Sequence, residues 1–97
     1  MPAFVYILAN RENGTLYVGS TTDIENRLNE HRNDSFEGVT KRHGLRRLVY
    51  LEAFPTLADA RTQEWRMKHW KQEWKIEAIV AKNPSWRDQG KDFGDFL

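Results

Sequence analysis

Three short runs of β-branched, aliphatic and aromatic residues predict three β-strands. The first run spans residues 4–8 and the second spans residues 16–20, and the segment between them carries Asn13-Gly14. Asn-Gly between two such runs is a strong signal for a β-hairpin. A third run covers residues 48–54, and Pro55 ends it because proline cannot donate to a sheet ladder. The chain therefore begins with an antiparallel hairpin and adds one later strand.

Helical periodicity and capping signals predict three helices, over about residues 23–32, 56–70 and 72–81. Thr22 and Glu25 fit a capping box for the first helix, with the Thr22 hydroxyl accepting from the Glu25 amide. Thr56 opens the second helix by the same capping logic. The order ββαβαα predicts an α+β fold, in which helices flank a small three-stranded antiparallel sheet. We expect one domain over residues 1–87 and an irregular tail over residues 88–97.

Composition favours a soluble globular protein, with 39% hydrophobic and 30% charged residues. No apolar run is long enough to span a membrane, and the N-terminus lacks the pattern of a signal peptide, so we expect a cytoplasmic protein without membrane partners. The chain has no cysteine, which excludes disulfides, thiolate nucleophiles and thiolate zinc ligands. Any metal must therefore be held by oxygen or imidazole.

The net charge of only +1 does not by itself indicate a nucleic-acid-binding protein. Basic residues nevertheless concentrate in the middle and later parts of the chain. The candidate nucleic-acid contacts are Lys41, Arg42, Arg46, Lys68 and Lys71. The alternative is that these residues belong to ordinary solvated faces.

Tyr6 and Tyr17 are predicted to project from the same face of the hairpin. In an antiparallel pair, the residue numbers of any two facing residues add to the same total. That total is odd when the loop between the strands has an even number of residues. The positions of the two tyrosines add to an odd number, so without a bulge both phenols lie on one face. They either serve a site there or are simply half-buried strand residues.

The first helix carries two polar side chains on the stripe that must face the sheet. Ile24, Arg27, Leu28 and His31 follow an i, i+3, i+4, i+7 spacing. We expect Arg27 and His31 at the edge of the buried face. A guanidinium there lines a cleft or is held in an ion pair, because an unpaired buried charge is costly.

The second helix carries a carboxylate within its apolar stripe, because Glu64 follows Leu57 and Ala60 and precedes Met67. One interpretation is a functionally silent pair with Lys68 at i, i+4. The other is a carboxylate aimed at the same cleft as Arg27. One glutamate can suffice as the protein ligand of Mg²⁺, which keeps several waters.

These candidates, all expected at one face of the sheet, suit phosphoryl chemistry. Arginine binds phosphate and stabilises charge that develops on its oxygens. A carboxylate-bound cation polarises the scissile group, and tyrosine or histidine can move a proton.

The sequence resembles the GIY-YIG endonuclease domain, and its small stand-alone members in particular, over roughly residues 3–86. Phe4-Val5-Tyr6 stands at the first tripeptide of that family and Tyr17-Val18-Gly19 at the second. Two departures are Phe4, which replaces the first glycine, and Ser20, which stands where some members carry a lysine. The resemblance implies a divalent-metal-dependent endonuclease that hydrolyses nucleic-acid phosphodiester bonds, with DNA as the expected substrate.

The resemblance also implies roles for individual residues. Gly19 would be the glycine where the chain leaves the hairpin, and either Tyr17 or Tyr6 would accept a proton from the attacking water while the other positions it. Arg27 would stabilise the phosphorane-like charge, His31 would assist in positioning or proton transfer, and Glu64 would hold one Mg²⁺ or Mn²⁺ ion. A phenol with an ordinary pKa near 10 is a poor base at neutral pH, so the base is the weakest assignment.

The alternative function is a weak or inactive module of the same fold that binds nucleic acid or recruits a partner. In either case we expect a monomer or a weak homodimer. Trp65, Trp70 and Trp74 are interpreted as packing residues between the last two helices rather than as base-stacking platforms, and Trp86 as the residue that pins the tail.

Overall fold

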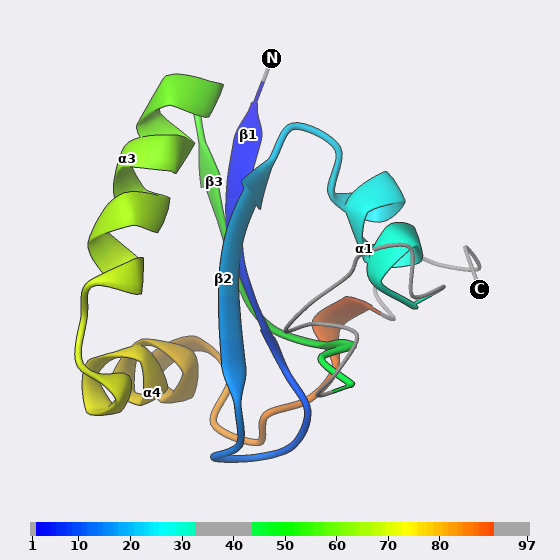
Figure 1. Cartoon of the computed structure of the whole chain (residues 1–97), viewed down its shortest axis with the longest axis vertical. Helices are drawn as coiled ribbons and strands as arrows, with labels where there is room; N and C mark the ends of the chain where they lie inside the picture. The colour runs from blue at the N-terminus through cyan, green and yellow to red at the C-terminus, as the bar shows by residue number, and fades with distance from the viewer. Residues whose placement is uncertain (1, 33–43, 91–97) are drawn as a thin grey trace.

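The computed structural model describes residues 2–32 and 44–90 of the chain (Figure 1). Its strands are β1 (Ala3–Ala9), β2 (Leu16–Thr21) and β3 (Arg47–Phe54). They form one antiparallel sheet in the order β2-β1-β3, which leaves β2 and β3 at its two edges. The helices are α1 (Ile24–Arg32), α3 (Leu57–Lys68) and α4 (Gln72–Lys82). The predicted α+β fold and the order ββαβαα are therefore confirmed.

The sheet has helices on both faces, with α1 on one side and α3 and α4 on the other (Figure 1). Each face has its own apolar cluster. The buried residues on the α1 side are Tyr6, Leu8, Ile24, Leu28, Leu45 and Leu48. Those on the α3 and α4 side are Ala3, Val5, Ile7, Ala9, Val18, Val49, Tyr50, Ala60, Met67, Ile79 and Trp86. Successive residues of β1 alternate between the two clusters, as side chains on a strand must.

The hairpin between β1 and β2 has the register that the two tyrosines require to share a face. Its six-residue loop contains a hydrogen bond from the Gly14 amide to the Arg11 carbonyl oxygen (3.0 Å), and Asn13 adopts a left-handed φ of 56°. Tyr6 pairs with Gly19 and Leu8 pairs with Tyr17. Both phenols therefore lie on the α1 face, which confirms the prediction from their spacing.

The helix caps agree with the sequence at one helix and differ at another. The Asp59 amide donates to Thr56 Oγ1 (3.2 Å), so Thr56 caps α3 as predicted. The predicted Thr22 cap of α1 is wrong. The Asp23 amide donates to Thr21 Oγ1 (3.0 Å), and Asp23 Oδ1 in turn accepts from the Asn26 amide (3.2 Å). This turn moves the cap one residue along the chain, so the helix begins at Ile24.

The second predicted helix ends earlier than expected, because the amide of His69 bonds to the carbonyl groups of Arg66 and Met67 and closes α3. At the start of the predicted tail, Asp88 Oδ1 accepts from the Leu48 amide (3.1 Å). This contact attaches residue 88 to β3. Trp86 is 2% exposed and belongs to the core, which agrees with its expected anchoring role. Among the described residues, no helix is long and apolar enough to cross a membrane.

Candidate active site

Three aromatic rings from three elements meet on the α1 face of the sheet. The ring centroids of Tyr6 and Tyr17 are 6.3 Å apart, and those of Tyr6 and His31 are 5.9 Å apart. The Tyr17 and His31 centroids lie 5.6 Å apart, so each ring contacts the other two. Tyr6 Oη and His31 Nε2 are 3.3 Å apart, within reach of a hydrogen bond. The structure therefore brings together three of the predicted site residues as one cluster.

Gly19 makes room for this cluster. It lies opposite Tyr6 in the middle of the pairing between β1 and β2, and Ser20 and Thr21 continue the strand after it. The expectation that Gly19 marks the exit from the hairpin is therefore wrong. A Cβ at this position would fall 2.4 Å from Tyr6 Oη and 2.5 Å from Cζ of the same ring. The Tyr6 phenol thus lies across the backbone of β2, in space that a side chain at position 19 would fill.

The electrostatics of the cluster keep Tyr6 and His31 neutral near pH 7. Burial raises the pKa of Tyr6, with a further contribution from Tyr17, and the nearby Arg27 guanidinium only partly offsets it. Burial and the positive charge of Arg27 lower the pKa of His31 to about 4. A neutral phenol therefore faces a neutral imidazole, and each of these groups can both donate and accept a hydrogen bond.

Arg27 lies at the edge of the buried face, as predicted. Its side chain is 31% exposed, and Nε lies 3.5 Å from a carboxylate oxygen of Glu30. An ion pair at this exposure contributes at most about 1 kcal/mol. The charge of Arg27 acts on Tyr6 and His31 at the same time. The guanidinium is therefore placed between the aromatic cluster and solvent, where it can meet an anion.

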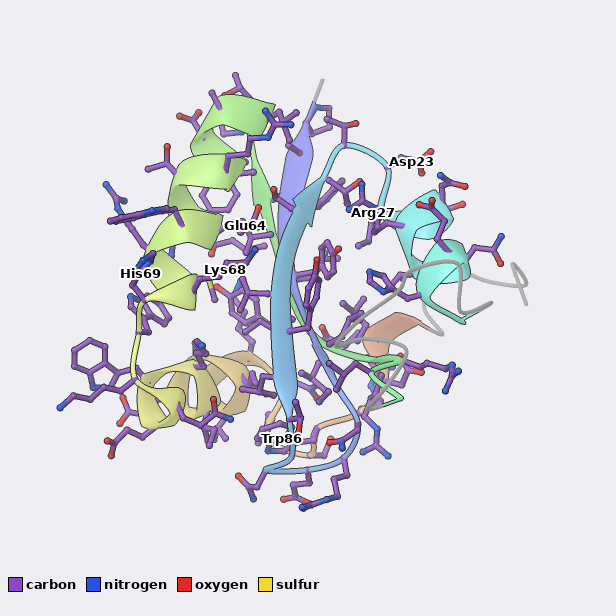
Figure 2. The ribbon with its side chains drawn as sticks, in the orientation of Figure 1. Asp23, Arg27, Glu64, Lys68, His69 and Trp86 are labelled. Carbon is purple, nitrogen blue, oxygen red and sulfur yellow. The ribbon has the colours of Figure 1, made fainter. Side chains whose placement is uncertain are left out.

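Glu64 reaches the site from the other side of the sheet. Its helix, α3, packs on the face opposite α1, so the expectation that Arg27 and Glu64 share one sheet face is wrong. Figure 2 shows Glu64 and Lys68 pointing toward β2 from α3, whereas Arg27 lies on the far side of that strand. Because β2 is an edge strand, side chains from both faces can meet at its open edge. The candidate site straddles this edge.

Two side chains hold the Glu64 carboxylate in place. Ser20 Oγ donates a hydrogen bond to Oε1, and Lys68 Nζ lies 2.6 Å from Oε2. Burial opposes ionisation of Glu64, but Lys68, Ser20 and the charge of Arg61 outweigh it and lower the pKa of the carboxyl group. Glu64 is therefore ionised at neutral pH. The pair with Lys68, one of the two interpretations of the sequence, is present.

Lys68 also links Glu64 to the aromatic cluster. Its Nζ lies 5.8 Å from the centroid of the Tyr17 ring, which is within the range of a cation–π contact. One ammonium group thus contacts a residue of α3 and a residue of β2. This contact connects the two halves of the candidate site around the strand edge.

The chemistry of Glu64 fits a Mg²⁺ or Mn²⁺ ion held by a single carboxylate. The carboxylate is ionised and its side chain is 20% exposed, which leaves room for the waters that Mg²⁺ retains. Among residues 2–32 and 44–90, no group of three or more histidine, aspartate or glutamate side chains could form a larger metal cage. A metal ion at Glu64 would have to take the place of the Lys68 ammonium at Oε2.

The other predicted nucleic-acid contacts have different surroundings. Lys68 belongs to the site, whereas Lys71 lies over the ring of Trp74, with Nζ 5.7 Å from its centroid. Arg46 follows the buried Leu45 in the segment that leads into β3. Lys41 and Arg42 lie outside the described residues. Among the described residues, Lys68 is the basic candidate that contacts the predicted catalytic residues Glu64 and Tyr17.

Two of the tryptophans do not pack as expected. Trp65 is 64% exposed and Trp74 is 48% exposed, so the interpretation of both as packing residues is wrong. Trp70 does pack against the core cluster. The error has a geometric cause, because Trp65 lies about 140° around α3 from Ala60, which is on the buried stripe.

Ser20 is the contact that sequence reasoning missed. In the sequence Ser20 is a departure from the lysine of some GIY-YIG proteins, and in the structure its hydroxyl bonds to Glu64 from the strand position after Gly19. Strand alternation offered a signal, because Ser20 must face away from Tyr6 and toward α3. Phe4, the other departure, packs beside the cluster on the α1 face and puts no polar group into the site.

Known proteins resemble the chain over most of its length. The model of the GIY-YIG catalytic domain matches residues 2–77. The UPF0213 protein BH0048 of Halalkalibacterium halodurans is 31% identical, covering 94% of this chain and 96% of that protein. The UPF0213 protein SAG0778 of Streptococcus agalactiae is 34% identical, covering 81% and 89% respectively. The solution NMR structure of BH0048, from Bacillus halodurans, has a TM-score of 0.57, with 31% identity and coverage of 94% and 96%.

Proposed function

Because the chain belongs to the GIY-YIG catalytic domain family, a nuclease family, we propose that it is a divalent-metal-dependent endonuclease that hydrolyses phosphodiester bonds of DNA. The observation that carries the proposal is the meeting of Tyr6, Tyr17 and His31 with Arg27 on one side of β2 and with Glu64 on the other. We further propose a cytoplasmic enzyme that acts as a monomer or a weak homodimer.

Arg27 is the proposed phosphate-binding group. A guanidinium can donate two parallel hydrogen bonds to phosphate oxygens, and its charge stabilises the negative charge that builds up on them during attack. Its exposed ion pair with Glu30 is weak enough to give way to a phosphate. Its position next to the Tyr6 hydroxyl would bring the scissile phosphate beside the aromatic cluster.

Tyr17 is the proposed acceptor of the water's proton, and Tyr6 its positioning partner. Tyr17 is partly exposed and can contact a water molecule, whereas Tyr6 is fully buried and its raised pKa disfavours the phenolate form. His31, held neutral, lies against both rings and fixes their orientation. A base must lie within hydrogen-bond reach of the proton that it accepts. The partly exposed Tyr17 meets this condition better than the buried Tyr6 does.

Glu64 is the proposed ligand of one Mg²⁺ or Mn²⁺ ion. When bound, such an ion polarises the scissile phosphate and stabilises the leaving oxygen. Ser20 would hold the carboxylate in position through its hydrogen bond to Oε1. Lys68 would give up its position at Glu64 Oε2 to the metal. Its ammonium group would remain near Tyr17, where its positive charge can attract the substrate.

A cleavage assay tests this function. Single-stranded, nicked, branched and duplex DNA are incubated with the protein and Mg²⁺ or Mn²⁺, and we expect products that disappear when the metal is chelated. Arg27→Ala and Glu64→Ala should abolish cleavage. Arg11→Ala and Glu12→Ala remove the same charges from the exposed hairpin loop and serve as matched controls. Cleavage that survives Arg27→Ala and Glu64→Ala would contradict the proposal.

The second candidate function is a binding module of the same fold with little or no turnover. The observation in its favour is that Ser20 and Lys68 already occupy both oxygens of Glu64. Salt-dependent binding would report how many phosphates the protein neutralises. Binding to DNA without cleavage under every metal condition would favour this module over the enzyme, whereas no binding at low salt would count against both.

A further inference from the structure

The two exposed tryptophans lie on helices that no other described element covers on that side. Trp65 projects from α3 and Trp74 from α4, and both keep about half or more of their surface in solvent. An indole is a large apolar group whose burial is normally favourable, so two exposed ones need an explanation. Trp70 and Trp86, in the same part of the chain, are packed against the core. The fold therefore packs two tryptophans in this part of the chain against the core and leaves Trp65 and Trp74 exposed to solvent.

Each exposed indole has a basic side chain against it. The ring centroids of Trp65 and His69 are 4.3 Å apart with an interplanar angle of 36°, and His69 Nδ1 lies 2.6 Å from the Trp65 carbonyl oxygen. This bond fixes the imidazole, which in turn holds the indole in one orientation. Lys71 Nζ lies 5.7 Å from the Trp74 centroid. Because the His69 contact orders the Trp65 ring, a ligand that stacks on this ring loses less conformational entropy.

The Trp65 side of α3 is continuous with the candidate active site. Trp65 directly follows Glu64, about 100° around the helix, and Lys68 lies between them on the helix surface. Arg61, one turn before Trp65, also acts on the Glu64 carboxylate. At a helix radius of about 5–6 Å, the path from Glu64 to Trp65 is about 10 Å long. A strand leaving Glu64 would pass positive charge before it meets the indole.

The charge around Trp65 favours a nucleic acid over an apolar protein partner. Arg61 and Lys68 lie on the path described above, whereas Lys71 lies over Trp74, and Glu64 is the single acid between residues 61 and 71. Val80, the third exposed large hydrophobic residue, lies about 120° around α4 from Trp74, so the three do not form one apolar patch. Glu73 and Glu77 lie near Trp74 in α4, which makes Trp65 the stronger of the two rings.

We propose that Trp65 with His69, extended by Trp74 with Lys71, forms a stacking surface for unpaired bases of single-stranded DNA. Bases stack on indoles without regard to sequence, and nearby cations bind the backbone. This inference rests on the proposed function and narrows it: the substrate has a single-stranded segment next to the bond that is cut. Fully paired DNA offers no base face to the surface and gains nothing from it.

Tryptophan fluorescence of the full chain tests the surface without catalysis. The protein, in EDTA and at low salt, is titrated with a short oligothymidylate and with a duplex of the same length. We expect the oligothymidylate to quench the emission. Trp65→Ala should weaken oligothymidylate binding by about five- to a hundredfold, as expected for the loss of one stacked base, and should change duplex binding less than about twofold. Trp65→Phe should retain most of the affinity.

Val80→Ala is the matched control, because it removes an exposed hydrophobic side chain of α4 that is not part of the stacking surface. It should bind both DNA forms like the unmodified protein. Three results would overturn the proposal: Trp65→Ala with unchanged oligothymidylate binding, equal weakening of single-stranded and duplex binding, or conversion of a dimer to a monomer in sedimentation, which would identify the surface as a contact between two copies.

The test is separable from that of the nuclease. Arg27→Ala and Glu64→Ala leave the stacking residues in place, so both variants should still show Trp65-dependent quenching. If no substrate is cut under any condition while this quenching persists, the proposed function fails and the stacking surface stands. If DNA is cut and Trp65→Ala neither weakens single-strand binding nor slows cleavage of substrates with single-stranded segments, the surface fails and the nuclease stands.

Discussion

Gly19 lies directly opposite Tyr6 in the hairpin, and a Cβ at Gly19 would fall 2.4 Å from the Tyr6 hydroxyl oxygen. The two residues are therefore a matched pair: the tyrosine supplies a buried phenol, and the glycine supplies the space over β2 that the phenol occupies. Displacing the phenol would also disturb its contacts with Tyr17 and His31.

Gly19→Ala should impair both activity and stability. The added methyl group must push the Tyr6 ring aside, and misplacement by about 1 Å can cost on the order of a hundredfold in rate, whereas overpacking costs about 1–3 kcal/mol in the free energy of unfolding. Cleavage rates and urea unfolding measure the two effects. Thr22→Ala, at the exposed position just after β2, should change neither. A fully active Gly19→Ala variant would show that the position of Tyr6 does not matter to catalysis.

Tyr17→Phe and Tyr6→Phe should separate the two phenols by role. Both substitutions keep the ring, so the aromatic contacts remain and only a hydroxyl is lost. If Tyr17 accepts the water's proton, Tyr17→Phe should lower kcat by about a hundredfold or more with little change in KM, and Tyr6→Phe should have the smaller effect. The reverse order would assign the proton transfer to Tyr6. Thermal unfolding of both variants checks that the fold is retained.

The fold was largely predictable because its signals are local. Neighbouring residues alone determine strand alternation, the Asn13-Gly14 turn and the Thr56 cap. The even number of residues in the hairpin loop was enough to place Tyr6 and Tyr17 on one face. The α1 cap was predicted one residue too early because Thr21 uses its hydroxyl to shape the turn before the helix. Two adjacent residues that can each cap a helix are not distinguished by local rules alone.

Helical spacing predicts which polar side chains point toward the sheet, but not how these side chains are arranged around it. Helical spacing identified Arg27, His31 and Glu64 as polar groups on inward stripes, and the structure puts them near the sheet. Spacing does not say which face of the sheet a helix covers, so the meeting of Arg27 and Glu64 around the edge of β2 required the tertiary structure. The exposure of Trp65 follows from its angle on α3, about 140° from the buried Ala60, and its hydrophobicity alone does not predict it.

His31 should make the protein less stable as the pH falls. Its pKa is about 4 in the folded protein, lowered by burial and by Arg27, against an ordinary value of 6.5. Between pH 6.5 and 4, His31 therefore binds a proton in the unfolded chain but not in the folded protein. The stabilisation is fully present above pH 6.5 and is lost as the pH falls toward 4, at a cost of about 3 kcal/mol.

Urea unfolding of the wild type and of His31→Gln at several pH values measures this contribution. Carboxylates also titrate in this range, so the quantity of interest is the difference between the two curves. We expect the free energy of unfolding of the wild type to fall more steeply than that of His31→Gln between pH 6.5 and 4. Parallel curves would mean that His31 is protonated in the folded protein as readily as in the unfolded chain.

Lys68→Met should strengthen metal binding at Glu64. Lys68 Nζ competes with a cation for Oε2 and repels it, and the pair, with side chains 46% and 20% exposed, contributes at most about 1 kcal/mol. Its removal should therefore lower the Kd for Mn²⁺ by about two- to fivefold, measured by calorimetry without DNA. Arg66→Met removes the same charge from an exposed position about 200° around α3 from Glu64 and should have a smaller effect. Weaker Mn²⁺ binding by Lys68→Met would mean that Lys68 orients the Glu64 carboxylate for the metal instead of competing with it.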